Sequence, residues 1–158
     1  MSEIRIVHDY PQSPDKVWRA VTDPEFVRRW TATGRGGTPV GFIPEVGNKF
    51  QFVGKPVPGW RGIVDCEVLA VHEPSSLRYS WVGTEGEAPS YVTYHLEPHA
   101  DGTRFTYEHT GFTGVGGFFM ARLLGKVRTK MLTVGLPAVL GDMDDSGTLR
   151  ADGTPGRG

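Results

Sequence analysis

The stretch "SPDKVWRAVTDPEFVRRW", residues 13–30, carries the same helix-start signal twice. Ser13 and Asp23 are residue types that cap helices, and each is followed by a proline, which suits the first helical position. After each start, apolar residues recur at spacings of three and four, which places them on one side of a helix. The sequence therefore predicts two short helices, each with an apolar face to bury: Val17, Trp18 and Val21 on the first, and Phe26, Val27 and Trp30 on the second.

The segments around this stretch alternate with a period of two, which is typical of strands with one buried face. Residues 3–9 predict a first strand that ends at Pro11, and residues 38–110 predict five or six more, separated by glycine or proline. Short connections such as Asp101-Gly102 favour hairpins, so we expect an antiparallel sheet. The predicted inward face comprises Ile4, Ile6, Phe50, Phe52, Val64, Cys66, Val68, Leu77, Tyr79, Trp81, Val92, Tyr94, Leu96, Phe105, Tyr107 and His109.

The C-terminal part changes to helical spacing over residues 115–143. The predicted apolar stripe consists of Met120, Leu123, Leu124, Val127, Met131 and Val134, with Arg122, Lys126 and Lys130 opposite. Pro137 has no amide hydrogen and predicts a kink or break near residue 133. Residues 144–158 are polar and rich in glycine, so we expect a disordered tail after one domain at residues 1–143.

Residues 3–143 resemble the helix-grip fold of the START-like (SRPBCC) superfamily, an α+β fold shared with the birch-pollen allergen. Trp18, Thr22-Asp23-Pro24 and Trp30 resemble the N-terminal signature of the domain family named after the activator of the heat-shock chaperone ATPase. Residues 59–81 and 102–112 are similar to its central strand pairs. The resemblance implies a curved antiparallel sheet of six or seven strands around a long C-terminal helix, with a largely apolar cavity between them that opens near the short helices.

Bulk composition excludes several classes of function. With 17 Lys+Arg against 18 Asp+Glu, the net charge is -1, so we expect no nucleic-acid partner. Cys66 is the only cysteine and no apolar leader follows the N-terminus, so we expect a cytoplasmic protein. The longest mostly apolar run, residues 131–141, is too short to cross a bilayer, so we expect no membrane insertion.

The glycines of residues 107–124 follow a strand and precede a helix, as phosphate-binding loops do. However, Gly117 and Phe118 stand where a Walker loop needs lysine and a hydroxyl, and Phe119 stands where a dinucleotide fingerprint needs its last glycine. We therefore interpret this segment as the corner between the last strand and the helix. The five histidines lack zinc-site spacing, so we expect no metal and no cofactor.

We expect a ligand-binding cavity lined by Phe50, Phe52, Val64, Trp81, Tyr94, Phe105, Tyr107, His109, Phe119, Leu123 and Val127. His109 can be a structural histidine bonded to the backbone or a group that faces the ligand. The tyrosines can fill the core or orient a ligand through their hydroxyls.

The resemblance implies binding of a small hydrophobic or aromatic molecule, lipid-like or polyketide-like, by a monomer or homodimer. One alternative is a cyclase or dehydratase that uses His109 and a tyrosine as proton carriers; the sequence contains no recognisable nucleophile–base constellation, so catalytic residues stay unknown. Another alternative is a chaperone-associated module or an antibiotic self-resistance protein. Because one fold hosts many functions, the sequence alone does not choose among these.

Overall fold

A computed structural model describes residues 2–31, 38–55, 58, 62–83, 86, 88–112, 122 and 124–143. Within these residues the strands form one antiparallel sheet of seven strands in the order β1-β7-β6-β5-β4-β3-β2. The strands are β1 (Ser2–Tyr10), β2 (Thr38–Val40), β3 (Lys49–Val53), β4 (Ile63–His72), β5 (Ser76–Val82), β6 (Ser90–His99) and β7 (Gly102–Phe112). The predicted antiparallel sheet is confirmed.

The two faces of the sheet differ as the alternation predicts. Cross-strand register aligns Tyr79 with Val92 and Tyr94 with Tyr107, so these inward side chains form continuous rows across the strands. Between Val68 and the residues after it the register shifts, which makes Leu69 an extra residue of a β-bulge. Leu69 is therefore exposed, and the apolar alternation of β4 resumes after it.

Both predicted helices are present: α1 (Pro14–Thr22) and α2 (Pro24–Thr31). The Ser13 hydroxyl accepts a hydrogen bond from the backbone amide of Lys16 at 3.3 Å, and the Asp23 carboxylate accepts one from Glu25 at 3.0 Å. These caps satisfy amides that have no partner inside the helix. The indole nitrogen of Trp30 donates to the carbonyl of Ala20 at 2.9 Å, which fixes α2 against α1.

The C-terminal helix contains an irregular turn where the sequence predicts an interruption. Residues 124–130 are α-helical, followed by the π-helical turn η2 (Met131–Gly135) and by α4 (Leu136–Asp142). The amide of Leu136 reaches back to the carbonyl of Met131, and Pro137 has no amide to offer the next carbonyl. The Tyr10 hydroxyl donates instead to the carbonyl of Leu132 at 2.5 Å, which joins the end of β1 to this turn.

The predicted apolar stripe is wrong beyond Met131. Val134 was expected on the buried side but is 56% exposed. A π-helical turn contains more residues than an α-helical turn, so it rotates the following side chains away from the 3.6-residue period. The residues that this rotation buries are Leu132, Gly135, Leu136, Val139 and Leu140.

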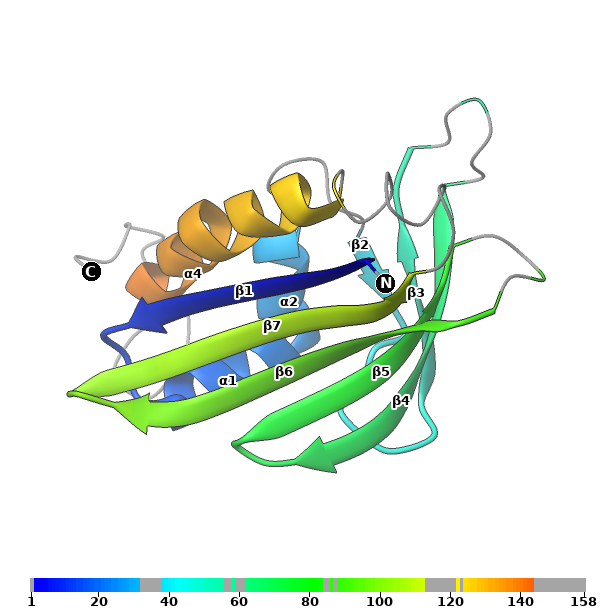
Figure 1. Cartoon of the computed structure of the whole chain (residues 1–158). Coiled ribbons are helices and arrows are strands. Elements are labelled where there is room, and N and C mark those ends of the chain that lie inside the picture. The colour runs from blue at the N-terminus through cyan, green and yellow to red at the C-terminus, as the bar shows by residue number, and fades with distance from the viewer. Residues whose placement is uncertain are drawn as a thin grey trace.

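Figure 1 shows how these elements enclose an interior. The sheet curves around the C-terminal helix, and α1 and α2 lie on the same side of the sheet as that helix. The core forms between them from the inward face of the strands and the buried sides of the helices. This is the helix-grip arrangement that the sequence predicts. The predicted glycine-rich corner, with Phe119 and Leu123, and the predicted tail lie outside the described residues.

Candidate ligand-binding site

The structure brings most of the predicted cavity-lining residues to one face. Those that are buried on the inward side of the sheet are Phe50, Phe52, Val64, Tyr94, Phe105, Tyr107 and His109. Trp81 and Val127 pack against this core but are only half-buried. Phe119 and Leu123 lie outside the described residues.

Aromatic rings cover the inward face as one connected layer. The Phe50 ring meets Tyr79 edge-on at a centroid distance of 5.3 Å, and Tyr79 meets Tyr94 at 5.7 Å. The layer continues from Tyr94 to Tyr107, also at 5.7 Å. Aromatic side chains provide a large apolar surface, so this face is suited to contact a hydrophobic molecule as well as to form a core.

The hydroxyls of this layer are paired with other polar groups. The Tyr79 and Tyr94 oxygens lie 3.1 Å apart in a buried hydrogen bond. Burial raises the pKa of both phenols well above the usual value, so both are neutral near pH 7. A neutral phenol can donate one hydrogen bond and also accept, so each hydroxyl keeps further capacity for a polar partner.

Arg128 is a site residue that was not predicted from the sequence. Its side chain is buried, with 7% exposed, and its Nε donates to the Tyr107 hydroxyl at 2.6 Å. The guanidinium carbon lies 4.6 Å from the centroid of the Trp81 ring, which is cation–π distance. The spacing of Leu124, Val127, Arg128 and Met131 is the i, i+3, i+4, i+7 pattern of one helix face, and it could have revealed this inward arginine.

His109 is completely buried and makes a hydrogen bond with a side chain, where one of the two interpretations expected a backbone partner. Its Nε2 lies 2.7 Å from the Ser90 hydroxyl, and its ring meets Trp81 edge-on at 5.2 Å. Burial, with a smaller contribution from the positive charge of Arg128, lowers the pKa of His109 to about 3. Ser90 was not predicted, although it is in phase with the inward residues Val92, Tyr94 and Leu96 of β6, so the alternation could have revealed its face.

The interior is less filled at one end than at the other. Leu132 and Leu136 are fully buried where the helix packs against α1 and α2. Leu124 and Val127, one to two turns earlier, are only half-buried, although they pack against the core. Trp81 on β5 is half-buried as well, and the Arg128 guanidinium that covers it comes from the same part of the helix. Solvent therefore reaches inward-facing apolar surface at this end.

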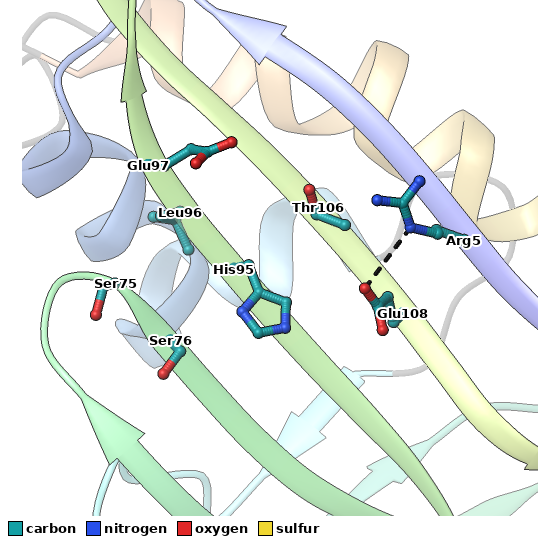
Figure 2. Close-up of a pocket in the computed structure, with 8 residues that line it drawn as sticks. All are labelled: Arg5, Ser75, Ser76, His95, Leu96, Glu97, Thr106 and Glu108. Carbon is teal, nitrogen blue, oxygen red and sulfur yellow. Dashed lines mark ion pairs between the residues drawn. The ribbon is translucent and has the colours of Figure 1, made fainter.

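A depression of about 430 Å³ lies on the outer face of the sheet. Figure 2 shows its side chains spread over several strands, and all of them except Leu96 are at least partly exposed. They are Arg5, Ser75, Ser76, His95, Leu96, Glu97, Thr106 and Glu108. Arg5 lies 3.7 Å from Glu108, so the positive charge here already has a carboxylate partner. The polar, open lining does not suit a hydrophobic ligand.

Three further findings in the described part of the chain concern metal binding, the cysteine and membrane-spanning helices. Within the described ranges, no three His, Cys, Asp or Glu side chains are grouped closely enough to hold a metal ion. Burial raises the pKa of the Cys66 thiol, so it stays protonated and is a weak nucleophile. None of the helices among the described residues combines the length and apolar character that a bilayer crossing requires.

Solved structures show the same fold. Protein MLL2253 from Mesorhizobium loti is 26% identical, with a TM-score of 0.75 over 90% of this chain and 99% of that one. CalU16 from Micromonospora echinospora is 25% identical, with a TM-score of 0.62 over 85% of this chain and 75% of that one. Mll3558 from Rhizobium loti is 29% identical, with a TM-score of 0.59 over 80% and 96%.

No curated protein matches the chain. The family model described as "Activator of Hsp90 ATPase homolog 1-like protein" matches residues 11–118, which include α1, α2 and the strands from β2 to β7. This match spans more than half of the chain and agrees with the family resemblance of the signature around Trp18 and Trp30. The chain therefore belongs to the family of Activator of Hsp90 ATPase homolog 1-like proteins.

Proposed function

We propose that this protein binds a small, largely apolar molecule between the inward face of the sheet and residues 124–131 of the C-terminal helix. The observation that carries the proposal is the partial exposure of Trp81, Leu124 and Val127. These side chains face the interior, and inward apolar groups of a closed core are buried. A bound molecule that covers them would remove apolar surface from water, which favours binding.

Polar groups beside this surface support a ligand site. Tyr107 and Arg128 form one buried pair, and Ser90 with His109 forms another, both in contact with Trp81. Small-molecule sites are mainly apolar with a few fixed polar groups that orient the ligand. The aromatic layer and these two pairs have that composition. We therefore expect an aromatic or aliphatic ligand with a polar substituent near Arg128.

The protonation state of His109 favours binding over acid–base catalysis. An efficient proton carrier has a pKa near the working pH. With a pKa of about 3, the imidazole is a poor proton acceptor near pH 7. The raised pKa of Tyr107 likewise keeps its phenol protonated, mainly because it is buried. This pair of groups therefore suits the positioning of a ligand better than the removal of a proton from it.

The test is a thermal-shift screen of wild-type protein and of Val127→Trp against hydrophobic and aromatic molecules. Ligands that bind the folded state raise its melting temperature. We expect hits with the wild type and a loss of those shifts in Val127→Trp, because the larger ring would occupy the space proposed for the ligand. The matched control is Val134→Trp, on the exposed side of the same helix, which should keep the wild-type shifts.

The melting temperatures without ligand provide a second criterion. If the space beside Val127 is open, Val127→Trp should fold with nearly wild-type stability. If that space is already packed, the extra atoms should cost about 1–3 kcal/mol of unfolding free energy. A strongly destabilised Val127→Trp, together with no ligand shift in the wild type, would contradict the proposed function.

A further inference from the structure

We infer that the ligand carries a carboxylate and that Arg128 binds it. This inference rests on the proposed function and adds the chemical class of the ligand. The observation behind it is that Arg128, a charged side chain, lies among apolar residues. Arg128 is 7% exposed and shares its helix face with Leu124, Val127 and Met131.

The hydrogen bonds of Arg128 leave one edge of the guanidinium available. A guanidinium has five N–H donors in one plane. The Nε–H donates to Tyr107, and one face of the plane lies over Trp81. Within the described residues, neither terminal nitrogen of Arg128 makes a hydrogen bond. Those two nitrogens form the edge that binds a carboxylate with two parallel hydrogen bonds.

The charge of Arg128 has no counter-ion in the described part of the chain. Arginines on the outer face of the sheet have such partners in two cases: Arg104 lies 2.9 Å from Asp9, and Arg5 lies 3.7 Å from Glu108. The groups around Arg128 are neutral tyrosines and a histidine whose pKa it helps to lower. A buried charge without a counter-ion is costly, so an anion that enters this space gains more there than it would at the surface.

A neutral amide or alcohol would leave this charge unbalanced, whereas a carboxylate would neutralise it. On β4, Asp65 alternates to the outer side of the sheet, where it accepts a hydrogen bond from Gln51 at 2.8 Å. The aromatic layer would then hold the apolar part of the ligand beside the carboxylate. An aromatic acid combines both features.

The experiment compares 2-naphthoate with 2-naphthamide, which have the same ring but differ in charge. Their dissociation constants would be measured by isothermal titration calorimetry near neutral pH on the full chain. We expect wild-type protein to bind the naphthoate about tenfold more tightly or better, because charge-assisted bidentate hydrogen bonds are the stronger kind. Arg128→Met should remove this preference, and Lys130→Met, which deletes an exposed charge from the same helix, should keep it.

The outcomes separate the inference from the function on which it rests. Equal binding of both probes by wild-type protein would overturn the carboxylate assignment while leaving the proposed function in place. Failure of both probes to bind would contradict both. Arg128→Lys replaces Arg128→Met in this experiment if Arg128→Met does not fold. Lysine keeps the positive charge but lacks the planar guanidinium that makes two parallel hydrogen bonds. We expect Arg128→Lys to retain only part of the preference, and a full wild-type preference would overturn the bidentate contact.

Discussion

His109 shows how burial turns a titratable residue into a neutral structural one. It is completely buried between Ser90 and Trp81, and its pKa of about 3 lies far below the ordinary value of 6.5. The unfolded chain therefore binds a proton at this residue at a higher pH than the folded chain does. Stability from His109 is fully present above pH 6.5 and is lost as the pH falls toward 3.

We predict that the unfolding free energy falls by about 1 kcal/mol on account of His109 between about pH 7.5 and about pH 5.5. Urea denaturation at both pH values measures this difference. In His109→Gln the difference should shrink by that amount, because the group that takes up the proton is gone. His95→Gln is the control, since His95 is exposed on the outer face. An unchanged pH dependence in His109→Gln would contradict this, because it would show that the pKa of His109 is nearly the same in the folded and unfolded chains.

Arg128 and Ser90 mark the limit of sequence prediction at the level of single residues. The alternation within β7 was enough to predict the side of the sheet that Phe105, Tyr107 and His109 face. Arg128 was not predicted as a site residue, since charged side chains are rarely buried. The packing of the helix against Trp81 and Tyr107 shows its place in the interior.

At the scale of elements, the π-helical turn η2 is the feature that joins the helix to the sheet. Its Leu132 carbonyl cannot bond to Pro137, and the Tyr10 hydroxyl from the end of β1 satisfies it. The sequence predicts the interruption from Pro137 but not its form, because a kink, a break and a π-helical turn all follow from a missing amide. The choice depends on a tyrosine that is more than a hundred residues away in the chain.

We predict that Tyr10→Phe lowers the unfolding free energy by about 1–3 kcal/mol, because it leaves a buried carbonyl without a donor. Tyr91→Phe is the matched control, since Tyr91 is half-buried on the outer face beneath Arg78 and should lose much less. Urea denaturation at neutral pH measures both variants. Equal stability of Tyr10→Phe and wild type would mean that the Leu132 carbonyl finds another partner, such as water.

At the scale of the whole molecule, the sequence predicts the architecture well because simple local patterns dominate it. The period of two along the strands and the capping signals at Ser13 and Asp23 both follow local chemistry, and both are confirmed. The interior is harder to predict, because its shape depends on how far the helix lies from the sheet. That distance is set by contacts among α1, α2, η2 and α4, which no local pattern encodes.

The most direct test of the account is the position of bound 2-naphthoate, measured by intermolecular nuclear Overhauser effects in solution. We predict contacts from the naphthalene ring to the methyl groups of Val127 and to the indole of Trp81, because both are half-buried on the inward side. Contacts confined to His95 and Thr106 would place the molecule in the outer depression and would contradict the account.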